Sequence, residues 1–357
     1  MSLRPRPRRV RVPAAALGAG LFALACRASP SDDADAAPAV ERRIVSTSYG
    51  AMGTTVRFTA FTGEPARARA AFEAALAEFH RLEDLHSNWR PHSDVSRLNA
   101  RAGVRPVEVA PETLELLGLA KRMHALTGGK FDVSFGALSD LWRFDHDQDN
   151  RVPEPAAIAA RLPLVDAGRI RLHPDEGTAY LPEAGMAVHL GGIGKGYAVD
   201  RAVRILRERG LDSFMVQAGG DLYAAGRRGD RPWRVGIRDP RGGPSDFFAA
   251  AEVEDRTFST SGDYERFFVK DGVRYHHILD PETGRPARGV RSVTVLAPSA
   301  VEADALSTGV FLLGIEAGLA VVEARPGVGA VLVDDDGRVH VSKRIAGRVD
   351  LLRSPTP

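Results

Sequence analysis

A glycine-rich turn beside a lysine is the first stretch whose residue types could do chemistry. Residues 189–200, HLGGIGKGYAVD, set four glycines around Lys195 and lead into an amphipathic run. Glycine lets backbone amides approach an anion closely, and the start of a helix favours negative charge. The stretch therefore indicates a bound phosphate. A tight connection between a strand and a helix, with a solvated lysine, is the alternative.

The common nucleotide motifs do not fit this turn. A Walker A loop ending at Lys195 would need Ser or Thr in place of Gly196 and Gly in place of His189. A dinucleotide fingerprint that starts at Gly192 would need Gly in place of Tyr197. The turn therefore indicates neither a P-loop NTPase nor a Rossmann sheet.

A carboxylate and a hydroxyl four residues apart form a second candidate site. Asp304 and Thr308 fall in an apolar stretch that we expect to be a helix, started by a capping box of Ser299 and Glu302. Residues at i and i+4 lie on the same helical face. Hard oxygen ligands of this kind suit Mg²⁺, which also binds substrate phosphates. The alternative is a half-exposed Asp and a Thr that is bonded back to its own helix.

Two histidines precede a turn in the sequence HHILDPETG, residues 276–284. Turn chemistry explains the segment from Asp280 onward. It does not explain His276 and His277, because adjacent strand residues point to opposite faces and at least one imidazole should approach whatever the turn surrounds. His277 could donate or accept a proton near neutral pH, and a structural histidine is the alternative.

Three aromatic residues could stack on a planar ring system, although each could equally belong to the core: Trp89, Trp142 and Tyr197. Catalytic triads, zinc-spaced cysteine pairs and EF-hand loops do not occur in the sequence.

The N-terminal end of the chain differs in composition from the rest. Five arginines and then an uncharged stretch precede Cys26, the only cysteine of the 357 residues. LFALAC resembles the lipobox of bacterial lipoproteins, so we expect a signal peptide over 1–25, acylation of Cys26 and a disordered tether over 26–43. The remaining chain is slightly acidic and has no basic patch with interleaved aromatics, so nucleic acid is not an expected partner.

Residues 44–350 read as one compact catalytic domain, followed by a C-terminal tail over 351–357. Helical periodicity predicts helices at 65–85, 111–126, 197–209, 301–313 and 316–324. Strand-like runs occupy 43–48, 54–61, 214–217, 233–237, 247–253, 266–270, 273–279 and 290–296, and a hairpin is expected around 335–338. Helices and consecutive strands mix without β-α alternation, which predicts an α+β fold with a mixed or antiparallel sheet and packed helices.

Taken together, nine segments of the sequence resemble the ApbE family of FAD:protein FMN transferases. In chain order they are AMGTTVRF, SNWRPHSDVSRLN, TGGKFDVSFGALSDLWRF, HLGGIGKGYAVD, VQAGGDLYAAG, WRVGIRDP, FSTSGDYERFF, YHHILDPETG and EADALSTGVFLLG. The resemblance implies an ApbE-like, T-fold-related catalytic unit in a periplasmic and often lipidated enzyme. It also implies that the enzyme splits FAD with Mg²⁺, releases AMP and attaches FMN through a phosphoester to a threonine of a partner. Flavinylated subunits of membrane electron-transfer complexes are the implied partners.

The resemblance also implies roles for individual residues. Asp304 and Thr308 match magnesium ligands, with the carbonyl of Gly192 as a third, and Lys195 matches a flavin-nucleotide contact. His189 stands where many members have an acidic residue. The implied FAD pocket comprises Met52, Trp89, Ala137, Leu138, Ser139, His189, Lys195 and Ile278.

The chemistry of the implied reaction leaves two groups open: the residue that accepts the proton and the molecule that accepts the FMN group. Transfer needs charge neutralisation on the phosphate oxygens and an in-line nucleophile. His277 or Asp280 would assist deprotonation of the threonine. If water entered instead, the site would be an FAD pyrophosphatase that gives FMN and AMP. A non-catalytic flavin-binding lipoprotein is the third reading.

Overall fold

The computed structural model describes residues 41–145 and 147–357, which form one unit from Glu41 onward. The expected signal peptide, Cys26 and the expected tether up to residue 40 lie outside the described residues. The first strand begins at Arg43.

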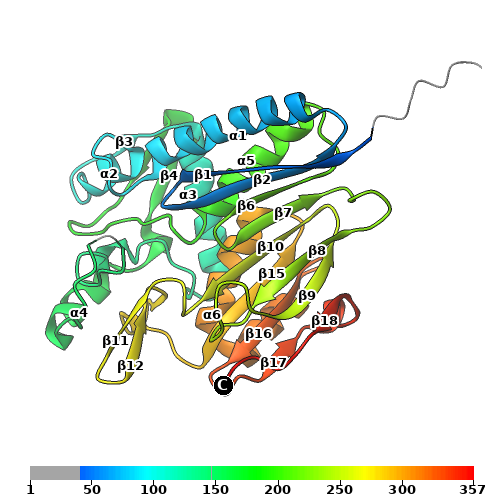
Figure 1. The fold of residues 1–357 in the computed structure, drawn as a ribbon. Helices are drawn as coiled ribbons and strands as arrows, with labels where there is room; N and C mark the ends of the chain where they lie inside the picture. The colour runs from blue at the N-terminus through cyan, green and yellow to red at the C-terminus, as the bar shows by residue number, and fades with distance from the viewer. Residues whose placement is uncertain (1–40, 146) are drawn as a thin grey trace, which may run out of the picture. The chain divides into compact units, whose positions relative to one another are not determined.

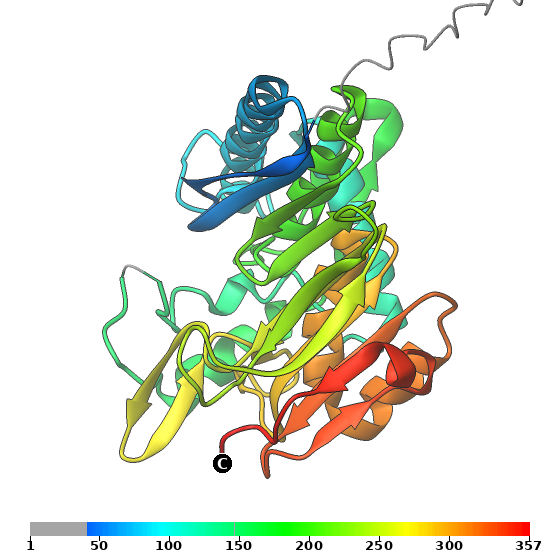
Figure 2. The same cartoon turned by 45° about the vertical axis from the view of Figure 1, so that its right-hand side comes forward.

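An eight-stranded sheet forms the centre of this unit, with β1 and β2 at one end and β16 and β17 at the other (Figures 1 and 2). Its order is β1-β2-β6-β7-β10-β15-β16-β17, and each neighbouring pair is antiparallel. The predicted α+β class with an antiparallel sheet is confirmed. The strands are β1 (Arg43–Ala51), β2 (Thr54–Thr62), β6 (Phe214–Ala218), β7 (Asp221–Ala225), β10 (Arg256–Gly262), β15 (Val290–Ala297), β16 (Gly329–Asp334) and β17 (Val339–Val341).

Three long helices cover one face of this sheet: α1 (Pro65–His86), α5 (Gly194–Glu208) and α6 (Ala300–Glu323). A fourth, α3 (Pro111–Leu126), packs against α6. Alternation along β2 places Phe58 beneath α1, where its ring lies 5.4 Å from that of Phe72 and 6.1 Å from that of Phe79. Helix α6 breaks at Gly314 (φ 78°, ψ −171°), between the two helices predicted at 301–313 and 316–324. By length and composition alone it could cross a membrane. It packs instead against β10 and β15 as a core helix.

A three-stranded sheet covers part of the opposite face, with its own apolar cluster around Trp233, Phe248 and Phe258. Its strands are β8 (Trp233–Arg238), β9 (Phe247–Val253) and β18 (Val349–Leu351). The C-terminal residues continue from β18 along β9, where the N–H of Leu352 donates to the carbonyl of Phe248 at 2.8 Å. The hydroxyl of Thr356 donates to the buried carboxylate of Asp239 at 2.8 Å.

The remaining elements are short: α2 (Asp94–Asn99), α4 (Pro155–Arg161), β3 (Val107–Glu108), β4 (Arg171–His173), β5 (Thr178–Tyr180), β11 (Phe267–Lys270), β12 (Val273–His276), β13 (Leu279–Asp280), β14 (Arg285–Pro286), and 3-10 turns η1 (Gly136–Leu138), η2 (Leu162–Leu164), η3 (Ala167–Arg169), η4 (Pro174–Glu176) and η5 (Lys343–Arg348). A third apolar cluster, which includes Leu138, Trp142 and Leu279, joins several of them.

The start of α6 differs from the predicted capping box. The hydroxyl of Ser299 donates to the Asp200 carboxylate of α5 at 2.8 Å, and the N–H groups of Ala300 and Val301 donate to the same carboxylate at 2.8 and 2.9 Å. Glu302 pairs instead with Arg325. A tertiary carboxylate therefore caps this helix, and the expectation of a local box is wrong.

Candidate active site

The glycine turn and α6 meet at the first turn of α5. The N–H of Gly196 donates to Oδ2 of Asp304 at 2.9 Å. A Cβ on Gly196 would lie 2.3 Å from the carbonyl oxygen of Ala300 and 2.7 Å from Cβ of Asp304. Only glycine allows this approach of the two helices, so Gly196 brings Lys195 and Asp304 into one site.

Thr308 lies one turn beyond Asp304, beside the glycine turn. A Cβ on Gly192 would lie 3.6 Å from Oγ1 of Thr308. Oγ1 of Thr308 is 3.0 Å from Oγ of Ser261 on β10, which is 2.7 Å from Oγ of Ser307. The predicted metal residues thus come together as hard oxygen donors, a set that fits Mg²⁺. Ser261, which the sequence did not single out, orients the Thr308 hydroxyl.

Lys195 lies between two buried carboxylates. Its Nζ is 3.0 Å from the carbonyl oxygen of Gly191, 3.2 Å from Oδ2 of Asp221 and 3.6 Å from Oδ1 of Asp304. Burial alone would lower the pKa of Lys195, but the two carboxylates outweigh it and raise the pKa above its usual value. Lys195 is therefore a permanent cation.

Asp221 was missed by the sequence analysis. It opens β7 directly after a Gly-Gly pair and is 2 % exposed. Burial, followed by the charge of Asp221, raises the pKa of Asp304. Two buried carboxylates and one ammonium leave a net negative charge, which a divalent cation would offset.

Met52 and His189 border the same turn. Met52 sits at the tip of the β1–β2 hairpin with φ of 50°, a left-handed conformation that costs a non-glycine residue energy. Its Cε would lie 3.9 Å from a Cβ on Gly194. The N–H of Gly191 donates to Nδ1 of His189 at 3.1 Å, so a neutral ring carries its proton on Nε2. Burial lowers the pKa of His189 to about 4, and its ring lies 5.2 Å from that of Phe135.

The segment of Ala137, Leu138 and Ser139 runs alongside the approach to the glycine turn. A Cβ on Gly136 would lie 2.6 Å from the carbonyl oxygen of Ala187. Leu138 and Ile278 are both buried, and a Cβ on Gly284 would lie 3.6 Å from Leu138.

The three aromatic candidates separate by environment. Trp142 is buried and donates through Nε1 to the carbonyl of Gly284 at 2.8 Å. Tyr197 is also buried, and its hydroxyl donates to Glu115 at 2.7 Å. Both belong to the core. Trp89 is 56 % exposed.

The two histidines face different surroundings, because β12 ends at His276 and His277 lies in the bend that follows. His276 Nε2 lies 2.9 Å from the carbonyl of Ala287, and its Nδ1 accepts the N–H of Ile278 at 3.3 Å. His277 has a buried Nδ1 that finds no hydrogen-bond partner within residues 41–145 and 147–357. Burial, followed by the charge of Arg266, lowers the pKa of His277 to about 3. His277 is therefore neutral at pH 7.

Asp280 already has partners. Its carboxylate lies 3.1 Å from Nζ of Lys130 and accepts the N–H of Glu282 at 3.0 Å. Its carbonyl accepts the N–H of Gly284 at 2.7 Å, which closes the predicted turn. These contacts make Asp280 an anchor of the turn, whereas His277 has the unpaired nitrogen.

Arg266 is a second cation that the sequence analysis missed. Its guanidinium pairs with Asp145, and Nη2 would lie 3.7 Å from a Cβ on Gly53, beside Met52. The site therefore combines two cations with an acidic cluster, which is the charge pattern of a diphosphate and divalent-cation site.

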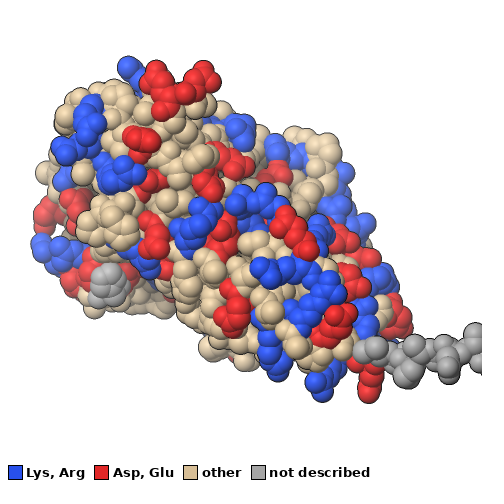
Figure 3. Space-filling model, turned by 90° about the horizontal axis from the view of Figure 1, so that it is seen from above, with Lys and Arg blue, Asp and Glu red and all other residues tan. Residues whose placement is uncertain are grey.

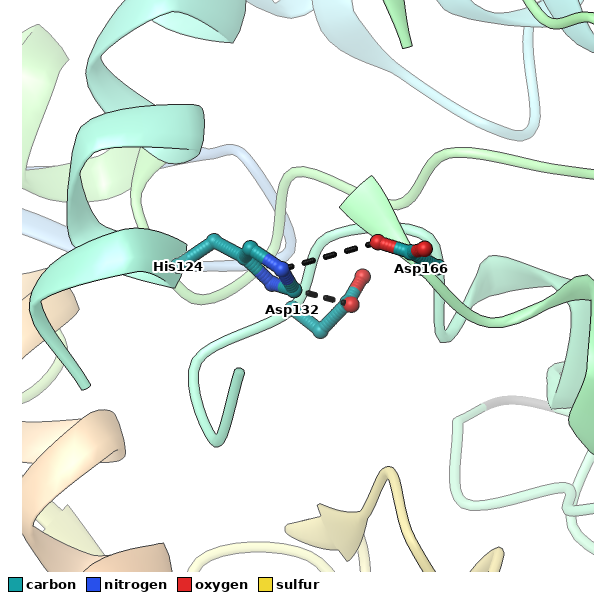
Figure 4. A group of neighbouring side chains, drawn as sticks. All are labelled: His124, Asp132 and Asp166. Carbon is teal, nitrogen blue, oxygen red and sulfur yellow. Dashed lines mark ion pairs between the residues drawn. The ribbon is translucent and has the colours of Figure 1, made fainter. Parts of the chain in front are cut away.

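A separate group of possible ligand atoms lies at the end of α3 (Figure 4). Nδ1 of His124 is 3.1 Å from Asp132, and Nε2 is 3.6 Å from Asp166. Each ring nitrogen faces a different carboxylate, which is the geometry of an imidazolium. The nearby Asp132 carboxylate raises the pKa of His124 despite its burial. Asp132 also accepts the N–H of Ala167 at 2.9 Å, so the group ties the start of the 132–139 segment to η3.

This ion pair predicts a pH-dependent stability. Because the folded pKa lies above the unfolded value of 6.5, the stabilisation is complete below pH 6.5 and disappears as pH rises through the folded pKa. His124→Gln should cost about 1.5–3 kcal/mol of unfolding free energy at pH 5.5 and clearly less at pH 9. Urea unfolding at both pH values measures this. His92→Gln, at a histidine 71 % exposed, is the control, and a loss for His124→Gln that is equal at both pH values would contradict the prediction.

Similarity to known proteins covers nearly the whole described domain. The ApbE family model matches residues 52–332. An FAD:protein FMN transferase of Treponema pallidum is 38 % identical over 317 residues, which is 84 % of this chain and 87 % of that protein. An FAD:protein FMN transferase of Vibrio cholerae is 35 % identical over 73 % of this chain and 79 % of that protein.

Solved structures have the same fold. An ApbE protein from Thermotoga maritima matches with a TM-score of 0.78 and 36 % identity, over 85 % of this chain and 98 % of its own. The flavin transferase ApbE from Vibrio cholerae matches with a TM-score of 0.77 and 31 % identity, over 86 % and 99 %.

Proposed function

The chain belongs to the ApbE family and is an FAD:protein FMN transferase, and from this premise we propose that Asp304, Thr308 and the carbonyl of Gly192 hold Mg²⁺ at the diphosphate of FAD. The observation that carries the proposal is the convergence of the glycine turn and α6. Lys195 and Asp304 come from different helices, and their charged groups lie 3.6 Å apart.

The reaction joins an acceptor hydroxyl to the FMN half of FAD. The oxygen of a threonine side chain in the partner attacks the phosphorus that carries the riboflavin. The bond from that phosphorus to the oxygen bridging to the AMP phosphate breaks, and AMP leaves with the electron pair. Mg²⁺, when bound, neutralises charge on the phosphate oxygens. Lys195 contributes a fixed positive charge to the same oxygens, and the first turn of α5 adds its dipole.

His277 receives the proton of the attacking hydroxyl in this proposal. Its ring is neutral at pH 7, and its buried Nδ1 has no hydrogen-bond partner among the described residues, so this nitrogen is open to a proton. Asp280, the other predicted catalytic residue, supports the turn that follows through its contacts with Lys130 and Glu282.

The remaining predicted residues line the FAD site. Trp89 offers an exposed aromatic surface, and the Phe135–His189 pair offers another ring face near Lys195. The proton on Nε2 of His189 makes this residue a donor to the nucleotide, whereas an acidic side chain there would accept. The proposed FAD pocket comprises Met52, Trp89, Ala137, Leu138, Ser139, His189, Lys195 and Ile278.

We place the enzyme in the periplasm, anchored to the membrane through a lipid on Cys26. Its partner would be a flavin-accepting subunit of a membrane electron-transfer complex.

The face over α1 carries basic and acidic side chains side by side (Figure 3). Helix α1 itself carries such a pair, Arg81 with Glu78 at 2.8 Å.

A flavinylation assay tests the function. Purified enzyme, FAD, Mg²⁺ and an acceptor domain with a target threonine should give a fluorescent covalent band and one AMP for each flavin transferred. An acceptor with that threonine replaced by alanine is the control. If FMN and AMP form equally without acceptor, the enzyme is a pyrophosphatase. If AMP never forms at any divalent cation concentration, the protein only binds flavin.

A further inference from the structure

The Lys195 ammonium and a bound cation would compete for one oxygen of Asp304. Oδ2 of Asp304 already accepts the N–H of Gly196 at 2.9 Å. Oδ1 faces Nζ of Lys195 at 3.6 Å, which is longer than a hydrogen bond. The same oxygen is the one available to a cation. Something must therefore keep the ammonium from closing on it.

Asp221 supplies that restraint. Its Oδ2 is the carboxylate oxygen nearer to Lys195, at 3.2 Å, and the carbonyl of Gly191 takes a second N–H of the ammonium at 3.0 Å. Both contacts are shorter than the 3.6 Å from Nζ to Oδ1 of Asp304, so the ammonium is held by Asp221 and Gly191. An ammonium has three donors, and two of them are thereby engaged.

The Asp221 carboxylate is itself held firmly. It begins β7 and pairs with Ser259 of β10 in the sheet register, and the Ser259 hydroxyl donates to its Oδ1. A Cβ on Gly220 would lie 2.6 Å from the carbonyl oxygen of Thr260, so the preceding turn packs tightly against β10. The acceptor for Lys195 is thus a rigid part of the sheet.

We propose that Asp221 is a positioning residue that holds the Lys195 ammonium off Oδ1 of Asp304, so that a divalent cation and the lysine can act on one diphosphate together. The inference rests on the proposed cation site. Without Asp221, the ammonium would close on Asp304 as its remaining charged partner. Cation affinity would then fall, although Asp221 is no ligand of the cation.

Mn²⁺ binding to the full-length enzyme without FAD, followed by electron paramagnetic resonance, tests this through a double-variant cycle. Asp221→Asn should raise the Kd for Mn²⁺ about tenfold. In a Lys195→Met background the same substitution should change the Kd by less than about threefold, because no ammonium remains to be restrained. If the tenfold loss persists in that background, Asp221 acts on the cation directly and the inference is overturned. It is also overturned if Asp221→Asn binds Mn²⁺ as the wild type does.

Ser259→Ala keeps the charge of Asp221 and removes only its support. It should weaken Mn²⁺ binding in the wild type and have no effect with Lys195→Met, which keeps the test decisive if Asp221→Asn does not fold. An unchanged Kd in the wild-type background would count against the inference. Mn²⁺ binding that survives Asp304→Asn would overturn the proposed cation site as well. If Asp304→Asn abolishes Mn²⁺ binding but Asp221→Asn and Ser259→Ala leave it unchanged, the role of Asp221 is overturned and the proposed cation site stands.

Discussion

Asp304→Asn is expected to lower kcat/KM for FMN transfer by about 10³-fold or more, since a catalytic cation stabilises the transition state by several kcal/mol. The substitution is nearly isosteric. The amide oxygen can still accept the N–H of Gly196, which now lies 2.9 Å from Oδ2, so the contact between α5 and α6 survives. The amide nitrogen would then occupy the place of Oδ1 and present a donor where the cation needs an acceptor. Steady-state AMP release with a saturating acceptor measures the effect.

Glu302→Gln is the matched control because it removes a carboxylate from the same helix. Glu302 pairs with Arg325 and has no contact with Lys195 among those described. Its variant should keep near-normal turnover and Mn²⁺ binding. If Asp304→Asn retained wild-type turnover at ordinary Mg²⁺ concentrations, the helix α6 would not contribute the metal ligand and the proposed site would fail.

Local patterns predicted the long helices and the central strands β6 and β15, but they missed β7 and β10 between them. Helix α3 agrees with its predicted bounds, because Pro111 and the Gly128-Gly129 pair mark its two ends. Strands β7 and β10 have the sequences DLYAA and RTFSTSG, rich in small and hydroxyl residues. They lie in the middle of the sheet and are buried by neighbours on both faces. Tertiary packing therefore makes them strands, and their own β-propensity contributes little.

The same limit applies to the site. The i and i+4 spacing of Asp304 and Thr308 is visible in one segment, and the structure brings it to the glycine turn. The role of Asp221 depends on Lys195 from another element, and an Asp after two glycines looks like a turn residue. Likewise Ser299 and Glu302 match a capping box, but the Ser299 hydroxyl donates to Asp200 of α5 and Glu302 pairs with Arg325. Contacts between distant segments decide these cases, and no local pattern encodes them.

Lys195→Met should separate charge stabilisation from cation binding. The loss of one fixed cation at the diphosphate is expected to lower kcat about 10²- to 10³-fold, the usual effect of removing one preorganised donor to developing charge. Cation affinity should move in the opposite direction, because Oδ1 of Asp304 loses its competitor and the site becomes more negative. Single-turnover AMP release and Mn²⁺ binding on the same variant measure the two effects.

Lys270→Met, at an exposed position on the β11–β12 hairpin, controls for the loss of a lysine elsewhere. It should leave both quantities unchanged. The opposite signs for Lys195→Met distinguish its role from that of Asp304, whose replacement removes the cation and the activity together. If Lys195→Met lost Mn²⁺ binding to the same degree as activity, Lys195 would support the cation site itself. The separate roles proposed here, charge stabilisation by Lys195 and cation binding by Asp304, would then be wrong. The ammonium would instead be needed for cation binding.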